Sequence, residues 1–441
     1  MTSSDGGRMP IEALVNALGA DKVVSDDNGI SNYAFDWTGN WYAKPVAVVL
    51  PENTEDVSAA LKICHEMNFS VVTQGGNSGL VGGAVGGDFP HVVLSTKNLR
   101  SQPIFNSATN QLTLGAGFTL QEVQEIAQSH GMQYPVDTPS RALATIGGNV
   151  ATNAGGVRVI AFGMTQQQVV GLRVVLSDGS VIDRLERLKK ENTGFDITAL
   201  FSASEGTLGV ITDVCLQLRA PRTVKWTAAV PCTNIQNALD VALSLQNELL
   251  AAELFQTSGA NKVAEAEGMK KLPAEKPWWL ILEGDGDKPE LPTDSQWALT
   301  PSEAAKLWNY RELQASMLNR LSKVVKVDSS VAPTHLPAYI ERITQELSAG
   351  DDLYIFGHLL DGNLHISVAN AEEKVATDIV LDAAVGFGGS VSAEHGIGQA
   401  KNDYVHLTKS VVEMKLMNDI RDSFDPKRIL NPHVLKFNVD K

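Results

Sequence analysis

Short apolar runs alternate with helical patterns along the first half of the chain. Continuous apolar runs bounded by glycine or proline are typical of buried strands, and apolar residues three or four positions apart are typical of helices. The turn signal at Asp178–Gly179 predicts a hairpin, and Asn53 or Thr54 is the expected N-cap of the first helix. Strands are predicted within 47–51, 70–76, 91–96, 112–132, 169–183 and 205–218, and helices within 53–68 and 112–132.

The pattern changes after Pro221 and predicts a second set of strands and helices. We expect a proline- and aspartate-rich loop at 284–294 and a helix over 301–322 that carries Pro301 in its first turn. Strands are predicted within 225–231, 278–284 and 323–331, a hairpin within 354–368, and further helices within 234–252, 334–348 and 373–389. The fold class is therefore α+β or α/β, and the boundaries give three segments: 1–222, 223–385 and 386–441.

Length and composition narrow the function classes. A chain of 441 residues is too long for one hydrophobic core, which agrees with several domains. The net charge of −15 argues against nonspecific binding to nucleic acid or to an anionic membrane. The three cysteines are far apart, so neither a disulfide framework nor a cysteine zinc site is indicated. With no secretory pattern at the N-terminus and no membrane-length apolar run, a cytoplasmic location is expected.

Three glycine-rich stretches in the first half suggest a bound nucleotide. They are TQGGNSGLVGGAVGG (73–87), ATIGGNVATNAGG (144–156) and SEGTLGVIT (204–212). Glycine allows backbone N–H groups to crowd around an anion such as a diphosphate. A flexible linker is the alternative, but apolar residues interrupt the first stretch, unlike a solvated linker. No stretch contains G-x-G-x-x-G, so a nicotinamide fingerprint is not supported.

The stretch YIFGHLLDGNLHISV (354–368) contains a candidate metal site. A two-residue turn at Asp361–Gly362 would place His358 directly opposite His365, with Cβ atoms roughly 5 Å apart. Glu394, in SAEHGIG, would add a carboxylate, and two histidines with one carboxylate suit a divalent metal with open positions. The alternative is a structural pair of histidines and a solvated acid, which the residues alone leave open.

Four motifs together resemble the vanillyl-alcohol oxidase superfamily, in its D-2-hydroxyglutarate and D-lactate dehydrogenase branch. They are QGGNSGLVGG, IGGNVATNAGG, NTGFDITALFSASEGTLGVIT and FDPKRILNP, and the resemblance covers nearly the whole chain. It implies a PCMH-type FAD-binding domain, a ferredoxin-like antiparallel-sheet cap that binds substrate, and a C-terminal segment returning to the FAD domain. The FAD should be non-covalent, because Asn77 and Ser78 stand where covalent members carry a flavin-linking histidine.

The resemblance also implies residue roles. Gly75, Gly76, Asn77, Ser78 and Gly79 would wrap the FAD diphosphate. The rest of the cofactor would be lined by Gly82, Gly83, Thr138, Gly147, Gly148, Asn153, Gly206, Ile211 and Asn431. His358, His365 and Glu394 would bind a divalent metal, zinc by preference, with His395 as general base and with Arg311 and Lys326 on substrate carboxylates. The implied reaction is oxidation of a D-2-hydroxy acid to the 2-oxo acid, with hydride transfer to the flavin.

Departures from the family pattern fall near the implied substrate pocket. Leu360 replaces a glycine, Ser367 replaces an asparagine, and Ala315 replaces a threonine that touches substrate in the hydroxyglutarate enzymes. The segment 284–300 is also shorter than its family counterpart. No implied metal ligand or base is lost, so the reaction class stands, whereas the choice between D-2-hydroxyglutarate, D-lactate and another hydroxy acid stays open.

Two other functions share this fold. A metal-independent oxidase of another alcohol would not need His358, and a non-catalytic flavin subunit of an oxidase complex should lack the metal and base residues, which are present here. The expected partners are a small 2-hydroxy acid and an electron acceptor, with electron-transfer flavoprotein, a quinone or a cytochrome as candidates. The sequence leaves the oligomeric state open, with a homodimer as one option.

Overall fold

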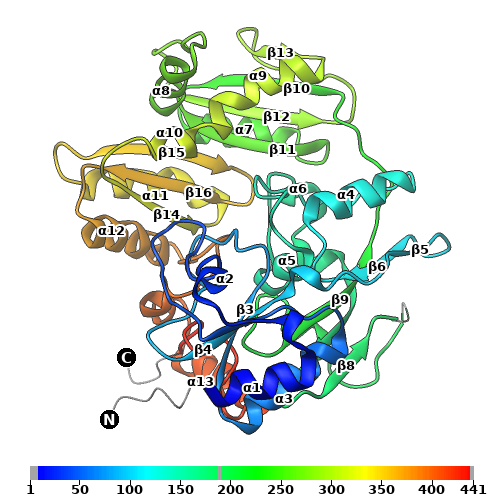
Figure 1. The fold of residues 1–441 in the computed structure, drawn as a ribbon. Coiled ribbons are helices and arrows are strands. Elements are labelled where there is room, and N and C mark those ends of the chain that lie inside the picture. Colours follow the sequence, from blue (N-terminus) through cyan, green and yellow to red (C-terminus); the bar gives the residue numbers. More distant parts are fainter. Residues whose placement is uncertain (1–7, 187, 189, 438–441) are drawn as a thin grey trace. The chain divides into compact units, whose positions relative to one another are not determined.

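The chain forms two compact units. The computed structural model describes residues 8–186, 188 and 190–437 (Figure 1). Within these residues, unit 1 comprises the chain up to Gly156, then 163–221 and the part from His395 onward, and unit 2 comprises 157–162 and 222–394. Both units combine helices with mainly antiparallel sheets, which confirms the α+β class.

Unit 1 begins with a four-stranded sheet in the order β1-β2-β4-β3. Its strands are β1 (Val23–Val24), β2 (Ala47–Val49), β3 (Ser70–Gln74) and β4 (His91–Ser95). The last three are parallel. The helices of this region are α1 (Arg8–Leu18), α2 (Asp27–Ser31) and α3 (Thr54–Glu66). Asn53 is the N-cap of α3, where its side chain accepts from the N–H of Asp56, because a carboxamide oxygen satisfies a free amide of the first turn.

A five-stranded antiparallel sheet follows in the order β5-β6-β9-β7-β8. Its strands are β5 (Ile104–Asn106), β6 (Gln111–Gly115), β7 (Val169–Val175), β8 (Val181–Arg184) and β9 (Val210–Gln217). The helices α4 (Leu120–Ser129) and α5 (Ile146–Thr152) share a core with it. The predicted hairpin is confirmed: β7 pairs with β8, and Gly179 takes a φ of 86° in the turn, which glycine adopts without strain.

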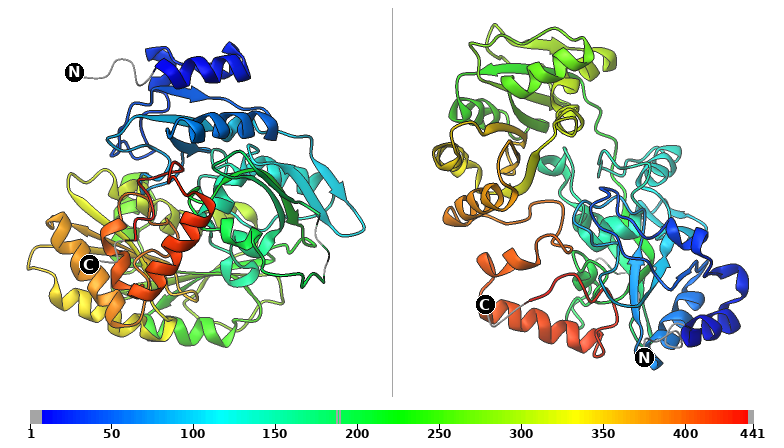
Figure 2. Two further views of the ribbon diagram at one scale, coloured as in Figure 1. Left: turned by 90° about the horizontal axis from the view of Figure 1, so that it is seen from below. Right: turned by 60° about the vertical axis from the view of Figure 1, so that its left-hand side comes forward.

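The C-terminal segment completes the first sheet. After α13 (Val411–Phe424), the chain returns to β3, where the N–H of Val71 donates to Ile429 O (2.8 Å) and the N–H of Asn431 donates to Val71 O (2.9 Å). This segment is drawn in red, beside the blue strands of the sheet, in Figures 1 and 2. The buried Arg421 stabilises it by donating to the carbonyl oxygens of Leu430, Asn431, Val434 and Leu435.

Arg421→Met should destabilise unit 1 strongly. The change leaves buried carbonyl groups without donors, and each such group is expensive to desolvate, so we expect a loss of about 3 kcal/mol or more in the free energy of unfolding. Arg428→Met is the matched control, because Arg428 pairs with Asp422 at the surface and should change that free energy by no more than about 1 kcal/mol. Chemical denaturation of both variants measures the difference, and equal losses would contradict the assignment.

Unit 2 is built on one seven-stranded antiparallel sheet in the order β13-β10-β12-β11-β15-β16-β14 (Figure 1). The strands are β10 (Trp226–Cys232), β11 (Leu249–Gln256), β12 (Trp278–Gly284), β13 (Gln296–Ala298), β14 (Val324–Ser330), β15 (Asp352–His358) and β16 (Asn363–Ala369). The helices are α6 (Val159–Phe162), α7 (Ile235–Ser244), α8 (Thr257–Glu267), α9 (Pro301–Glu312), α10 (Gln314–Leu318), α11 (Leu336–Glu346) and α12 (Glu373–Gly386).

One face of this sheet supplies the candidate site. Apolar side chains of α8, α9 and α10 pack on it around Phe255, Trp279 and Phe356. Because side chains alternate along a strand, the residues two positions from these aromatics, including Glu253 and His358, point to the same face.

Three expectations for unit 2 are corrected. The predicted helix over 234–252 ends at Ser244, and residues 249–256 form the strand β11. The predicted helix over 301–322 is interrupted between Glu312 and Gln314, and β13 lies between the predicted loop 284–294 and this helix, where no strand was predicted. Among the described residues, no helix is both long and apolar enough to span a bilayer.

Candidate active site

The first glycine stretch lies against the second in unit 1. A Cβ on Gly76 would lie 1.9 Å from the carbonyl oxygen of Leu143, and one on Gly75 would lie 2.5 Å from Thr145 Oγ1. The loop that follows β3 therefore approaches the start of α5 so closely that only glycine fits. Gly147, at the start of α5, is equally confined, because its Cβ would lie 2.7 Å from the Cβ of Ala116.

The third stretch meets the C-terminal segment. Asn431 accepts from the N–H of Thr73 (2.8 Å) and donates to the carbonyl oxygen of Glu205 (2.7 Å). Gly206 takes a φ of 72°, and a Cβ there would lie 2.9 Å from Asn431 Nδ2. Asn431 thus joins the first and third stretches through protein contacts.

The other predicted cofactor residues lie on the same loops or at their ends. Asn77 and Gly82 have positive φ, and a Cβ on Gly82 would lie 2.7 Å from the ring of Trp41. Asn153 ends α5 in the left-handed conformation. Ser78, Gly79, Gly83 and Gly148 lie on the first two stretches, Thr138 lies in the half-buried segment before α5, and Ile211 is buried in β9.

Buried polar atoms without partners accompany these loops. The side-chain atoms concerned are Thr73 Oγ1, Asn77 Oδ1, Ser95 Oγ, Thr96 Oγ1 and Asn149 Nδ2. Buried polar groups are nearly always hydrogen-bonded in native proteins. A large polar ligand across the glycine loops, such as FAD, would satisfy them, and the confined glycines provide the close backbone approach that a diphosphate requires.

In unit 2, His358 lies between two carboxylates. Its Nδ1 is 2.5 Å from Glu253 Oε1, and its Nε2 is 2.7 Å from Glu394 Oε1. Burial lowers the pKa of His358, but the two carboxylates outweigh burial and raise this pKa well above 6.5. Burial in turn raises the pKa of Glu394, yet the charge and hydrogen bond of His358 hold it at about 2. A carboxylate and an imidazole so close together can share a cation.

His365 completes a group of three possible ligands. One donor atom from each of His358, His365 and Glu394 lies within 4.8 Å of the other two. The rings of the two histidines are 5.7 Å apart. Burial lowers the pKa of His365 to about 4, so its ring is neutral at pH 7 and can offer a lone pair. Two nitrogens and one carboxylate are the donor set of many open divalent-metal sites, so these residues fit the implied metal.

The predicted hairpin turn is wrong in length. His358 pairs with Asn363 rather than with His365, which lies opposite Phe356. A two-residue type I′ turn needs positive φ at both central residues, but only Gly362 has it, with a φ of 75°. The loop is therefore four residues long, 359–362. The shift of two positions keeps both histidines on one face.

Asp328 anchors the segment that carries Glu394. Its Oδ2 accepts from the backbone N–H of Glu394 (2.9 Å) and of Ala393 (3.2 Å). Its Oδ1 is 3.9 Å from His365 Nδ1. Asp328 thereby fixes the loop of one possible ligand and lies next to the ring of another.

The two predicted substrate cations have different surroundings. Arg311 is buried at the end of α9 and donates from Nε to Glu253 Oε2 at 2.6 Å. Lys326 lies opposite Ser367 in the sheet, and its ammonium group donates to the carbonyl oxygen of Ala315 (3.4 Å) and to the side-chain oxygen of Asn319. Two of the departures from the family pattern, Ser367 and Ala315, are thus neighbours of Lys326.

His395, the predicted base, directly follows Glu394 and is counted with unit 1. It is half-buried. The residues after it are held by Glu205, whose carboxylate accepts from the N–H groups of Ile397 and Gly398, both at 2.8 Å. The loop that carries His395 is therefore tied to the third glycine stretch.

Sequence reasoning did not single out Glu253 and Asp328. Glu253 lies within a run rich in leucine and alanine, LLAAELFQ, which was assigned in part to a helix. An acid within an otherwise apolar strand is a recognisable signal, because a buried carboxylate requires a partner.

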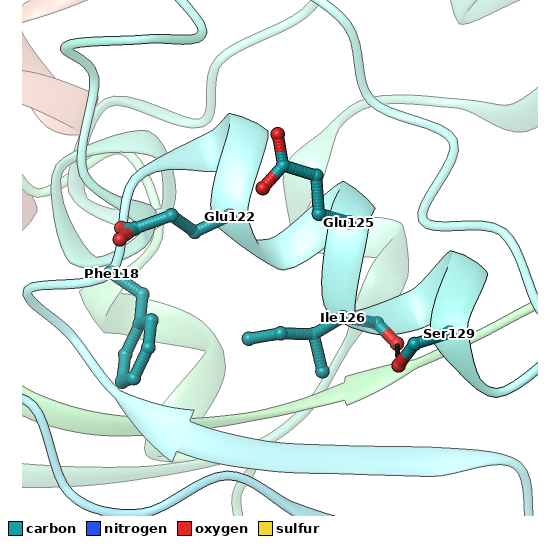
Figure 3. A pocket seen from close by; sticks show the side chains of 5 residues that line it. All are labelled: Phe118, Glu122, Glu125, Ile126 and Ser129. Atoms are coloured by element: carbon teal, nitrogen blue, oxygen red, sulfur yellow. Dashed lines mark hydrogen bonds between the residues drawn. The ribbon is translucent and has the colours of Figure 1, made fainter.

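A separate hollow of about 330 Å³ lies beside α4, lined by Phe118, Glu122, Glu125, Ile126 and Ser129 (Figure 3). None of these five residues belongs to the candidate site.

Comparisons with known proteins agree with this arrangement. Residues 45–184 match the family model for an FAD binding domain, and residues 222–435 match the model for the C-terminal domain of FAD linked oxidases. The D-2-hydroxyglutarate dehydrogenase of Xanthomonas citri pv. viticola is 33% identical over 454 residues, which cover 96% of each chain. This chain belongs to the D-2-hydroxyglutarate dehydrogenase family of FAD-dependent oxidoreductases. The mitochondrial D-2-hydroxyglutarate dehydrogenase of Danio rerio is 31% identical over 96% of this chain and 84% of that protein.

Solved structures share the fold of this family member at low sequence identity. p-Cresol methylhydroxylase has a TM-score of 0.73 with 15% identity, covering 100% of this chain and 98% of that chain. An alkyldihydroxyacetonephosphate synthase has a TM-score of 0.72 with 15% identity, covering 96% of this chain and 84% of that chain. These structures confirm the PCMH-type fold, and the family models and the relatives confirm the predicted superfamily and the FAD cofactor.

Proposed function

We propose that this protein oxidises a D-2-hydroxy acid, with D-2-hydroxyglutarate and D-lactate as leading candidates, to the corresponding 2-oxo acid with the help of a divalent metal. The observation that carries the proposal is the group formed by the buried His358 and the half-buried His365 and Glu394, whose donor atoms lie within 4.8 Å of one another. Relatives named as D-2-hydroxyglutarate dehydrogenases over the whole chain support the substrate class.

Bound FAD supplies the hydride acceptor. His358, His365 and Glu394 would hold the metal, zinc by preference, whose positive charge favours ionisation of an adjacent hydroxyl group. Arg311 and Lys326 would bind substrate carboxylate groups, because a guanidinium and an ammonium both pair with carboxylates. His395 would accept the hydroxyl proton while the hydrogen on the α-carbon leaves with its electron pair. The substrate thus loses one proton and one hydride and becomes the 2-oxo acid.

Non-covalent FAD would lie on the glycine loops of unit 1, with Gly75, Gly76, Asn77, Ser78 and Gly79 around the diphosphate. Its remaining contacts would come from Gly82, Gly83, Thr138, Gly147, Gly148, Asn153, Gly206, Ile211 and Asn431. The proposed electron acceptor is an electron-transfer flavoprotein, a quinone or a cytochrome. A reducing, cytoplasmic location is supported by Cys64, Cys215 and Cys232, which are buried and unpaired.

A dye-coupled assay tests the proposal. Purified protein with bound FAD is given D- and L-2-hydroxy acids and an artificial dye acceptor, with and without a chelator. We expect dye reduction with a D-2-hydroxy acid alone, loss of turnover after chelation, and recovery on adding Zn²⁺. Turnover of both enantiomers, or turnover that resists complete metal removal, would point to the metal-independent alternative.

A further inference from the structure

We propose that Glu253 is a positioning residue that orients both the metal ligand His358 and the substrate-binding Arg311, an inference that rests on the proposed function. No role for Glu253 follows from the motifs of the chain, because it lies on β11, far in sequence from each of them. One carboxylate would thus connect the metal site to substrate binding.

The contacts of Glu253 use both carboxylate oxygens. Oε1 is 2.5 Å from His358 Nδ1 on β15, and Oε2 is 2.6 Å from Arg311 Nε on α9. The side chain is fully buried. Burying a carboxylate is very unfavourable without strong partners, so a residue kept only for packing at this position would be apolar.

For His358, the contact selects the nitrogen that faces the other ligands. When Nδ1–H donates to Glu253, the lone pair of a neutral ring remains on Nε2, the atom that lies 2.7 Å from Glu394. Metal-binding histidines generally donate their second N–H to a carboxylate or carbonyl group, which fixes the ring and strengthens the ligand. Glu253 provides this contact from the neighbouring strand, where it pairs directly with His358.

For Arg311, the contact occupies Nε and leaves the terminal nitrogens available. Among the described residues, Nη1 and Nη2 of Arg311 have no hydrogen-bonding partner, although its side chain is only 8% exposed. A buried guanidinium with two unused donors suits a carboxylate ligand. The Glu253 contact restrains the direction in which those donors point.

The arrangement makes Glu253→Gln an informative change. Glutamine has the same shape, but it offers one oxygen and one NH₂ group, so only one of His358 and Arg311 can still donate to it. We expect the affinity for Zn²⁺ to fall about 10–100-fold, which is typical when an outer partner of a metal ligand is lost. The KM for the hydroxy acid should rise, and the flavin content and absorbance spectrum should stay as in the wild type.

Glu283→Gln is the matched control. Glu283 is a buried acid on the adjacent strand β12, and it is bound by Trp308 Nε1 (2.8 Å) and Arg158 Nη2 (3.2 Å) rather than by a ligand histidine. It shares the burial and charge of Glu253 without contacting His358. Its amide variant should keep wild-type affinity for Zn²⁺.

Zn²⁺ affinity is measured on the purified FAD-loaded proteins by competition with a fluorescent chelator, and thermal unfolding reports whether each variant is folded. If Glu253→Gln does not fold, Glu253→Asp is used instead. Aspartate keeps the negative charge, but its carboxylate lies one methylene farther from His358 and Arg311, so the same loss of Zn²⁺ affinity is expected. If a folded Glu253 variant binds Zn²⁺ with wild-type affinity, the inference about Glu253 is wrong, whereas the proposed function is unaffected. If the wild-type protein itself binds no Zn²⁺, the metal-dependent function and the inference fall together.

Discussion

Replacing His358 by alanine should remove the metal and lower kcat/KM by about 10³-fold or more. A metal ion that stabilises developing charge contributes several kcal/mol to the transition state, and each 1.36 kcal/mol corresponds to a factor of ten in rate. The variant loses one of the three ligand side chains and leaves Glu253 and Glu394 without the ring that separates them. Metal analysis of the purified protein and dye-coupled kinetics measure both effects.

Two other histidine variants show whether the loss is specific. His335→Ala changes a histidine of the same unit that lies beside Phe387, away from the site, and it should keep both metal and turnover. His395→Ala should keep the metal but lose turnover, because the proposed base is not one of the three proposed ligands. Intact turnover in a metal-free His358→Ala protein would favour the metal-independent oxidase.

Gly76→Ala should yield a destabilised protein without flavin. The new Cβ would lie 1.9 Å from the carbonyl oxygen of Leu143 and 2.7 Å from its carbon. Backbone atoms at that position cannot move aside without displacing the start of α5, so we expect the free energy of unfolding to fall by about 3 kcal/mol or more. Flavin absorbance of the purified protein and its chemical denaturation provide the measurements.

Gly79→Ala in the same loop separates folding from cofactor binding. A Cβ at Gly79 has no atom within 4 Å, so the free energy of unfolding should change by less than about 0.5 kcal/mol. Because Gly79 is proposed to lie against the FAD diphosphate, the FAD dissociation constant should rise while the apoprotein stays folded. If Gly76→Ala matches the wild type in stability and flavin content, the close approach to Leu143 has been misassigned.

The sequence predicted the candidate ligands better than their register. His358 and His365 were placed on one face by a turn of the wrong length, and they remain on one face because side chains alternate with a period of two. Local turn preference favoured the Asp361–Gly362 pair, but the backbone N–H of Asn363 donates to the Asp361 side chain (3.1 Å) and a longer loop forms. The choice between a two-residue and a four-residue loop depends on tertiary packing, which cannot be deduced from a single sequence.

Strand β11 was missed for a different physical reason. The run LLAAELFQ consists mostly of good helix formers and has no β-branched residue. It becomes a strand because it lies between β12 and β15 in the sheet, a long-range contact that overrides local preference. The contact between Glu253 and His358 could not be predicted without knowing that β11 pairs with β15. The helix cap at Asn53, by contrast, depends on residues within one turn, and such a short-range feature can be recognised in the sequence.

The contact between β3 and residues 429–431 has a consequence for biosynthesis. Domains generally fold as units as the chain emerges from the ribosome, but this edge of the FAD-binding unit is completed by Ile429, which is translated 358 positions after its partner Val71. All residues of unit 2 precede α13 in the chain, so this unit can fold before α13 is made. Along one side of β3, in contrast, the N–H and C=O groups of Val71 remain without their partners until residues 429–431 are made. Nascent chains of this protein are therefore expected to expose one edge of β3, which is paired only with β4, and ribosome-associated chaperones should be engaged until Asn431 emerges.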